Sequence, residues 1–370
     1  MDSFKGCLPS DQVGAAVAEG IRAALPGSAV TVLPIADGGE GTIDVFLSLP
    51  GAQAVELTVT GPLGDPVRAR YALLSDGTAV IETAQAIGLP LLSPEQRDPL
   101  RTGSSGVGEL ILDALDRGCR SFILGIGGSS TNDGGIGLLS ALGAEFTDAA
   151  GERVGRCGGE LQRVCRADFA ALDPRLAACR IRVACDVDNP LCGPHGAAAV
   201  FGPQKGADDA CVKVLDEALE HYSRVLTASG CADIAAEPGT GAAGGIGYAL
   251  RLLPGAALEP GAALLAQAAG LPELLRDADI LVTGEGRIDF QTARGKCPAT
   301  LAAMAKSAGV PVLALGGSVS ETDNAVFDAV FPICAGPCAL DEAMTPENAA
   351  ANLRRTAEQV FRVLSVGKQI

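Results

Sequence analysis

Short apolar runs alternate with longer amphipathic ones along this chain, and this alternation predicts strands followed by helices. Residues 9–25 are predicted to form a helix with Ser10 as its cap, and residues 29–36 an apolar strand. The same succession continues to the end of the chain. It predicts further helices at 102–117, 135–143, 212–228, 297–308 and 346–364, and further strands at 121–126, 181–184, 279–283, 310–315 and 328–333. Repeated βα alternation is typical of mostly parallel sheets with helices on both faces, so the predicted fold class is α/β.

A different pattern interrupts the alternation early in the chain. Residues 53–60, 67–74 and 79–83 alternate in polarity or carry β-branched side chains, and short glycine-containing turns separate them. This spacing predicts antiparallel strands joined by tight turns. We interpret it as the point where the chain enters a second domain, for which 370 residues leave enough length.

The net charge and the cysteine content of the chain exclude several classes of function. The formal net charge is −16 at pH 7, which argues against a nucleic acid or an anionic membrane as partner. No apolar run has transmembrane length, and the first residues lack the layout of a signal peptide. The 12 cysteines are scattered without a Cys-x-x-Cys pair, and there are 2 histidines, so neither a disulfide framework nor a zinc site is expected. We expect a reduced, cytoplasmic protein, and a homo-oligomer is compatible with these features.

A glycine-rich turn follows the predicted strand 121–126. Such a turn exposes backbone N–H groups where phosphate binds well. The residues expected to hold phosphate are Gly127, Gly128, Ser129, Ser130 and Thr131. Asn132 and Asp133 add oxygen ligands that suit Mg²⁺. The alternative is a tight turn in which Asp133 only caps the next helix.

Acidic side chains follow four of the predicted strands. The groups are Asp37 with Glu40, Asn132 with Asp133, Asp186 with Asp188, and Glu285 with Asp289. Each could be a turn acid or a helix cap. Because α/β sheets bind ligands at the carboxyl ends of their strands, and crowded carboxylates repel one another unless a cation is present, we favour Mg²⁺ with a nucleotide.

Basic residues occur in similar glycine contexts. They are Lys5, Lys205, Arg287 and Lys296. A cation in such a turn can hold a phosphate or a small carboxylate, and the alternative is an ordinary surface side chain. A Walker A motif, a Rossmann glycine motif and a nucleophile elbow are absent from the sequence. The residues alone therefore indicate a Mg²⁺-dependent enzyme that acts on a phosphorylated or anionic small molecule.

Eight segments together resemble the bacterial class I glycerate kinase family. They are residues 2–6, 36–42, 58–64, 125–135, 184–193, 200–206, 241–245 and 283–289, in unbroken order. The resemblance implies transfer of the γ-phosphoryl group of ATP to D-glycerate, with the 2-hydroxyl as the expected acceptor and 2-phosphoglycerate as the product. It also implies a discontinuous outer Rossmann-like (restriction-enzyme-like) α/β domain, residues 1–60 and 277–370, around an inserted flavodoxin-like α/β domain, residues 61–276, with the active site in the cleft between them.

Members of this family carry a short apolar strand before the turn that corresponds to residues 2–6. Met1 stands where that strand should end. We expect the native protein to be longer at its N-terminus, because that strand would direct the loop of Lys5 into the cleft.

Side-chain chemistry and position suggest a role for each candidate residue. The turn 127–131 and Lys205 are predicted to hold the nucleotide phosphates. Asp186, Asp188 and Glu285 are predicted Mg²⁺ ligands, and Asp186 is also placed among the catalytic residues. Asp37 or Asp133 is expected to orient the substrate hydroxyl or accept its proton. Lys5, also placed among the catalytic residues, and Arg287 are candidates for the substrate carboxylate.

Other functions fit the same acidic and glycine-rich motifs. They are a kinase or phosphohydrolase acting on another small hydroxy acid, phosphorylation at the 3-hydroxyl, and a binding protein that has lost catalysis. The intact motifs argue against the last of these.

Overall fold

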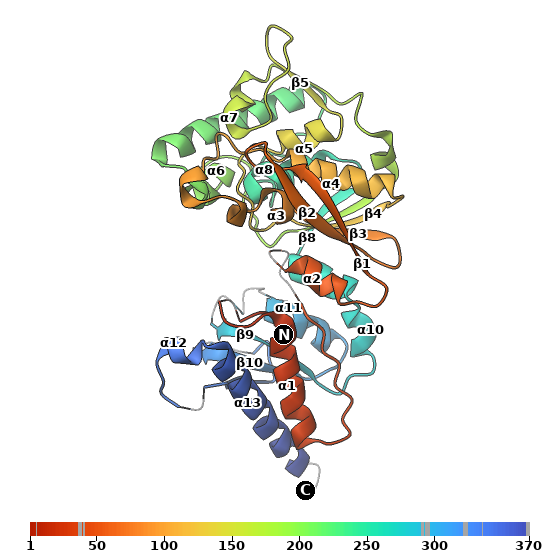
Figure 1. Ribbon diagram of the computed structural model, residues 1–370, viewed down its shortest axis with the longest axis vertical. Helices are drawn as coiled ribbons and strands as arrows, with labels where there is room; N and C mark the ends of the chain where they lie inside the picture. Colours follow the sequence, from red (N-terminus) through yellow and green to blue (C-terminus); the bar gives the residue numbers. More distant parts are fainter. Residues whose placement is uncertain are drawn as a thin grey trace. The chain divides into compact units, whose positions relative to one another are not determined.

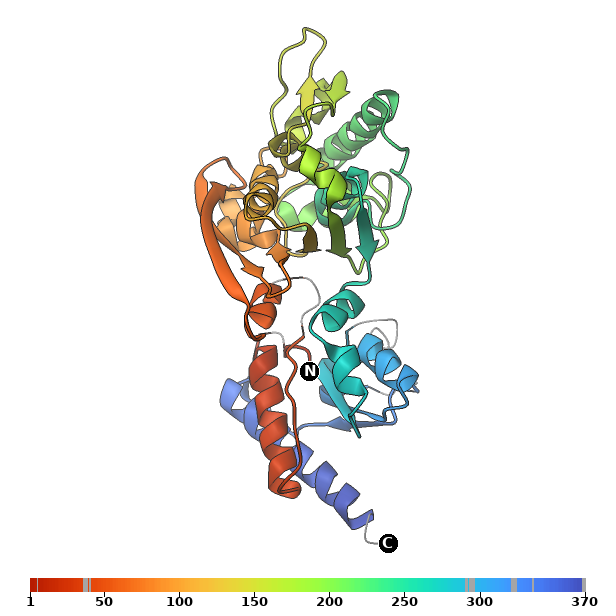
Figure 2. The same ribbon diagram turned by 90° about the vertical axis from the view of Figure 1, so that its right-hand side faces the viewer.

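The computed structural model describes residues 1–4, 6–35, 39, 41–289, 292, 297–320, 325–334 and 336–367. Its helices and mostly parallel strands confirm the predicted α/β class. The chain divides into two units, Met1–Asp37 with Ala262–Ile370, and Gly38–Gly261. Figures 1 and 2 show that the first unit contains both chain ends. The predicted boundaries at residues 60 and 276, and the two domain fold names, stay predictions.

A six-stranded sheet forms the centre of the unit 38–261. Its strand order is β1 (Gln53–Thr60), β2 (Pro66–Leu73), β3 (Thr78–Glu82), β4 (Ser121–Gly125), β7 (Arg180–Ala184) and β8 (Ala256–Glu259). The first three pair antiparallel, as predicted, whereas β3, β4, β7 and β8 pair parallel. Every residue of β3 is buried, because helices cover both faces of a parallel sheet. Because β3, β4 and β7 are parallel neighbours, their carboxyl ends meet at one edge of the sheet.

Helices and a small two-stranded sheet surround these strands. The helices are α2 (Thr42–Leu47), α3 (Ala84–Ile87), α4 (Ser105–Asp116), α5 (Ile136–Ala141), α6 (Ala197–Phe201), α7 (Asp209–Ala228) and α8 (Ala242–Leu252), and the small sheet pairs β5 (Glu145–Thr147) with β6 (Arg166–Asp168). Helix α7 begins three residues before its predicted start, because the Asp208 side chain accepts a hydrogen bond from Cys211 N at 2.8 Å. Its buried Leu215, Leu219 and Leu226 lie on one helical stripe.

The other unit is built on three parallel strands, in the order β11 (Ala329–Pro332), β10 (Val312–Val319) and β9 (Leu281–Ile288). Alternate residues of β10 face opposite cores. Leu313 and Leu315 pack with α1 (Ser10–Ala24) and α13 (Pro346–Gly367), which lie side by side in Figure 1. Val312 and Ala314 belong to the second core, with the helices α9 (Gly261–Ala268), α10 (Leu271–Leu275) and α11 (Cys297–Ser307). Helix α12 (Leu340–Ala343) precedes α13.

Two predictions near the start of the chain are wrong. Residues 29–35 pair with no other strand in the described chain, although their composition is that of a strand. Ser10 does not cap α1, whose N-cap is Pro9. Instead the Ser10 hydroxyl donates to Met1 O at 2.7 Å and accepts from Ile35 N at 2.9 Å. A side chain therefore provides the backbone of Ile35 with the partner that a neighbouring strand would otherwise supply.

Candidate active site

The turn after β4 reaches solvent through its two glycines. Gly127 is half-buried and Gly128 exposed, whereas residues 129–133 are buried. Gly128 has φ of 72°, in the left-handed region that a side chain disfavours. A ligand that approaches this turn therefore meets backbone atoms first. Phosphate binding by residues 127–131 stays a prediction. It requires a turn that a ligand can reach, and the exposure of Gly127 and Gly128 meets that requirement.

Hydrogen bonds fix this turn to the segment between β3 and α4. The backbone N–H and the hydroxyl of Ser130 both donate to Ile87 O, each at 2.8 Å. Leu89 N donates to Gly128 O at 2.9 Å, and the Thr102 hydroxyl donates to Ser130 O at 3.0 Å. The path of the glycine turn is therefore set before any ligand binds.

Asp133 organises the inner side of the turn. Its Oδ2 accepts from Ser104 N at 2.8 Å, from the Ser104 hydroxyl at 2.7 Å and from Gly137 N at 3.3 Å, and its Oδ1 accepts from Gly135 N at 3.1 Å. Burial raises the pKa of this carboxyl above its ordinary value, and the hydrogen bonds oppose that rise. Four donors around a buried carboxylate favour a positioning role over direct contact with substrate.

Lys205 braces the same turn from within the protein. It ends the short 3-10 helix Pro203–Lys205 and is 1% exposed. Its Nζ donates to Thr131 O at 2.6 Å and to the Ser129 hydroxyl at 3.2 Å. Burial lowers the pKa of Lys205 to about 7, and the nearby Asp133 carboxylate opposes this shift. The ammonium is therefore placed to hold the turn, and its predicted contact with phosphate stays a prediction.

The segment 241–245 packs against the turn by close backbone contact. Ala243, Gly244 and Gly245 have left-handed φ values at the start of α8, and Gly134 N donates to Gly244 O at 2.9 Å. A Cβ atom on Gly244 would collide with the carbonyl oxygen of Thr131. A larger residue at position 244 would therefore displace the turn, which explains the need for glycine here.

Two polar side chains beside this contact have no partner within the described part of the chain. They are the Thr131 hydroxyl and the Asn132 side-chain amide, both fully buried. A buried polar group without a partner costs about 1–3 kcal/mol, so such groups are usually explained by function or by bound water. These atoms are available to a ligand or a water at the glycine turn.

Asp186 and Asp188 follow β7 at the same edge of the sheet. Both are exposed. Asp186 Oδ1 accepts from Gly261 N at 2.6 Å, which fixes that carboxylate at the start of α9. The structure therefore brings Asp186 and Asp188 to the edge that carries the glycine turn, as the strand pattern predicts.

Glu285 and Arg287 belong to β9, in the other unit. The Thr292 hydroxyl donates to Glu285 Oε1 at 2.6 Å. The exposed Arg287 guanidinium pairs with Asp289, with 3.3 Å between Nε and Oδ2. Within the described residues, no three or more His, Cys, Asp or Glu side chains converge to hold a metal ion. Asp37 and Lys5, which were predicted to be catalytic, lie outside the described residues.

A sequence model of the glycerate kinase family matches residues 1–365. The chain belongs to the glycerate kinase family. The glycerate kinase of Halalkalibacterium halodurans is 45% identical over 362 residues, covering 95% of each chain. The glycerate 2-kinase of Escherichia coli strain K12 is 43% identical over 371 residues, covering 99% of this chain and 97% of its own. A crystal structure from Salmonella typhimurium LT2, assigned to glycerate kinase 2, has 44% identity and a TM-score of 0.90, and covers 100% of this chain and 98% of that one.

Membership of the glycerate kinase family confirms the predicted resemblance and the predicted enzyme class, an ATP-dependent phosphotransferase with an alcohol acceptor. No helix in the described residues has the length and apolar character needed to cross a membrane.

Sequence reasoning missed two buried polar residues around this turn. Ser104 supplies two of the four donors to Asp133. Glu82 ends β3 in a buried position, where Ile43 N donates to Oε1 at 2.7 Å and the Gln85 amide donates to Oε2 at 3.2 Å. Burial raises the pKa of Glu82. The rule that selected Asp186, an acid at the carboxyl end of a strand, selects Glu82 as well, whereas nothing in the sequence marks Ser104.

Proposed function

We propose that this chain transfers the γ-phosphoryl group of ATP to D-glycerate, at the 2-hydroxyl, to give 2-phosphoglycerate. Full-length similarity to proteins named glycerate kinase and glycerate 2-kinase supports the substrate and the acceptor hydroxyl. The observation that carries the proposal in this chain is the braced turn after β4. Its exposed tip is glycine, and buried side chains hold its other residues.

The turn binds the nucleotide phosphates through the backbone of Gly127 and Gly128. Lys205 and Asp133 act behind it as positioning residues, because both are buried and already bonded to the turn or its flanks. Phosphoryl transfer depends on positioning and charge neutralisation more than on covalent help, and a turn fixed before binding supplies the positioning.

Mg²⁺ belongs with the nucleotide in this proposal. Asp186 and Asp188 would hold it from β7, because carboxylate oxygens are the ligands that Mg²⁺ prefers. Glu285, the third predicted ligand, belongs to β9 of the other unit, and its contact with the ion stays a prediction. When bound, the ion neutralises negative charge on the transferring phosphate. The hydrogen bond from Gly261 N orients the Asp186 carboxylate without removing its charge.

Glycerate binds through its carboxylate to Arg287 and Lys5. The exposed Arg287 guanidinium suits a carboxylate, which would compete with Asp289 for it. Asp37 orients the 2-hydroxyl and accepts its proton. We choose Asp37 over Asp133 because the Asp133 oxygens already accept four hydrogen bonds. The buried Thr131 hydroxyl and Asn132 amide complete the polar contacts at the turn.

An ADP-release assay with D-glycerate, with and without Mg²⁺, tests the function. The proposal expects ADP in step with phosphoglycerate, and a ³¹P NMR spectrum of the product that matches 2-phosphoglycerate. Phosphate release without glycerate would instead indicate a phosphohydrolase, and turnover of a different hydroxy acid would change the substrate. Binding of ATP without any turnover would leave only a binding protein.

A cytoplasmic location fits this function. All twelve cysteines are free thiols, which suits a reducing compartment where ATP is available.

A further inference from the structure

Glu82 ends the buried strand β3, and its carboxylate holds the first turn of α2. Its Oε1 accepts from Ile43 N at 2.7 Å, and the residue is 2% exposed. The first N–H groups of a helix have no partner within that helix, and the N-cap of α2, Gly41, has no side chain to supply one. Glu82, 39 residues further along the chain than Ile43, provides the missing acceptor.

The Glu82 carboxylate is itself held in place. The Gln85 amide donates to Oε2 at 3.2 Å, so each carboxylate oxygen accepts a hydrogen bond. The backbone is fixed as well, because Glu82 pairs with Gly125 of β4 and Thr83 N donates to Gly125 O at 2.9 Å. Gly125 is the last residue of β4. The carboxylate that holds α2 therefore belongs to the sheet edge that carries the glycine turn.

The hold on α2 extends to the acidic segment that precedes it. The hydroxyl and the N–H of Thr42, which is fully buried, both donate to Gly39 O, at 2.9 and 3.4 Å. Gly39 stands two residues after Asp37 in the sequence. A series of hydrogen bonds therefore runs from Glu82, through the start of α2, to Gly39.

We propose that Glu82 is a positioning residue for phosphoryl transfer, which anchors the start of α2 and, with it, the segment that carries Asp37. This role rests on the one proposed for Asp37, which is to orient the 2-hydroxyl and accept its proton. Both Glu82 oxygens already accept hydrogen bonds inside the protein, so Glu82 itself does not touch the substrate. A displacement of about 1 Å in a group that meets the substrate can slow a reaction about 100-fold.

Glu82→Leu removes the carboxylate and keeps a buried side chain of similar size. Ile43 N and the Gln85 amide lose their acceptor, so the start of α2 should loosen. We expect kcat to fall about tenfold or more. The KM for ATP should stay within about twofold of the wild type, because the nucleotide phosphates bind at the glycine turn. Wild-type kcat in this variant, beside an inactive Asp37→Asn variant, would overturn the positioning role alone.

Glu82→Gln is the conservative variant that should preserve the anchor. The glutamine oxygen can still accept from Ile43 N, and the Gln85 amide can turn over so that its oxygen accepts from the new amide. We expect kcat within about threefold of the wild type. If Glu82→Gln were as slow as Glu82→Leu, the negative charge would matter and not the anchor, which contradicts the proposal.

Amide hydrogen exchange of residues 42–47 measures the anchor without an activity assay. Because Ile43 N donates to Glu82, this segment should exchange roughly tenfold faster in Glu82→Leu and as slowly as the wild type in Glu82→Gln. Equal exchange in Glu82→Leu and the wild type would show that no anchor exists. An active Asp37→Asn variant would instead disprove the role proposed for Asp37, and with it the use of the anchor in catalysis, even if the exchange result held.

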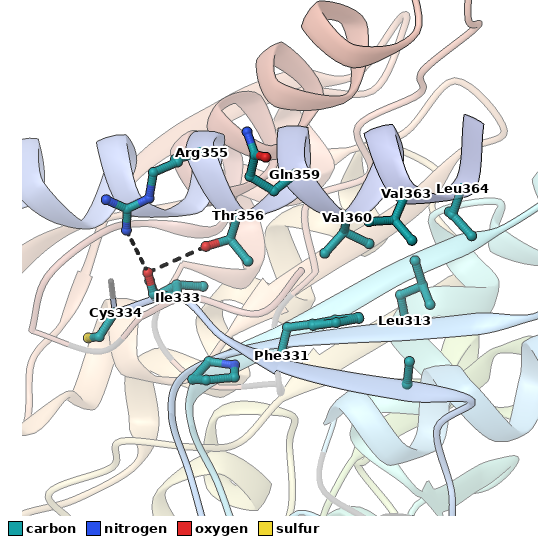
Figure 3. A pocket seen from close by; sticks show the side chains of 12 residues that line it. Leu313, Phe331, Ile333, Cys334, Arg355, Thr356, Gln359, Val360, Val363 and Leu364 are labelled. Carbon is teal, nitrogen blue, oxygen red and sulfur yellow. Dashed lines mark hydrogen bonds between the residues drawn. The ribbon is translucent and has the colours of Figure 1, made fainter. Parts of the chain in front are cut away.

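Two controls separate positioning from a general loss of stability. Asp173→Leu removes a carboxylate that accepts from Arg175 N at 2.9 Å and caps the 3-10 helix Pro174–Ala178, just before β7 begins at the opposite edge of the sheet. Arg355→Leu removes a guanidinium that donates to Ile333 O at 3.3 Å, in the other unit, beside an apolar cavity of about 390 Å³ (Figure 3). Neither residue belongs to the candidate site, so both variants should keep the wild-type kcat even where they lower the melting temperature. A fall in kcat equal to that of Glu82→Leu in both controls would reduce the role of Glu82 to stability.

Discussion

The Nζ atom of Lys205 lies 2.6 Å from the carbonyl oxygen of Thr131, in a position where the lysine is 1% exposed. Burial lowers the pKa of this lysine to about 7, with the Asp133 carboxylate opposing the shift. The ammonium group that holds the glycine turn therefore loses its proton near neutral pH, far more readily than an exposed lysine does.

Lys205 should make the free energy of unfolding depend on pH. Its pKa in the folded protein, about 7, lies below its value of 10.5 when unfolded, so the unfolded chain binds the extra proton between these values. Stability contributed by this group should therefore rise as the pH increases from about 7 to 10, by at most about 1.4 kcal/mol per pH unit. Below pH 7 both states are protonated and the dependence should end.

Comparison of the wild type with Lys205→Met isolates this effect. Denaturant unfolding between pH 6 and 10 should show the wild type gaining stability relative to the variant as the pH rises. Lys213→Met, at an exposed lysine of α7, serves as the control and should show no such change. Parallel curves for the wild type and Lys205→Met would contradict the assignment.

Asp133→Asn should weaken folding and activity together. An asparagine can offer one oxygen where four N–H and O–H donors now meet a carboxylate, so at least one donor is left unpaired. We expect a loss of about 2–4 kcal/mol in the free energy of unfolding, and a higher KM for ATP as the turn loosens.

Ser104→Ala provides the matching test, because it removes a donor and keeps the carboxylate. It should shift stability and KM in the same direction as Asp133→Asn, by a smaller amount. If Asp133→Asn instead lowered kcat alone and left stability intact, Asp133 would be a catalytic base and not a positioning residue.

Thr131→Val should separate stability from activity. The valine keeps the shape of threonine and removes a hydroxyl that has no partner within the described residues. Stability should stay equal or rise by about 1 kcal/mol, whereas kcat/KM should fall about tenfold if the hydroxyl contacts a ligand. Ser130→Ala is the contrasting variant and should lose about 1 kcal/mol, because its hydroxyl bonds to Ile87 O. A stability loss in Thr131→Val with unchanged kinetics would remove Thr131 from the site.

Asp186→Asn should abolish turnover without unfolding the protein. Asparagine can still accept the hydrogen bond from Gly261 N, but it lacks the negative charge that attracts Mg²⁺. We expect kcat to fall by about 100-fold or more, and any remaining activity to need more Mg²⁺. Asp65→Asn, at an exposed acid in the β1–β2 turn, is the control for charge alone. Activity near that of the wild type in Asp186→Asn would rule out its role with the metal.

The strands and helices were predictable where one periodicity persists over many residues. The bounds of β1 match the prediction, and those of α13 nearly do, because apolar spacing alone specifies a buried face. The strand predicted at 29–36 was wrong because a strand also needs a neighbour to pair with, which local composition cannot specify.

The candidate site was also predictable only in part. The strand-end rule placed Asp186 and the glycine turn at one sheet edge, since topology follows from the βα succession. It could not show that Lys205 is buried or that Asp133 is surrounded by donors. The donors to Asp133 include Ser104, which no motif marks, and the close contact with the turn comes from Gly244, which lies in a family segment more than 100 residues away.

The exposure of the turn also bears on inhibition and drug resistance. If the turn binds phosphate as proposed, a compound in that place would contact the main chain of Gly127 and Gly128, which have no side chain. Mutations that weaken such a compound would have to alter the buried residues around the turn, and those changes would damage the enzyme's own folding. Resistance at this position should therefore be costly to the organism that acquires it.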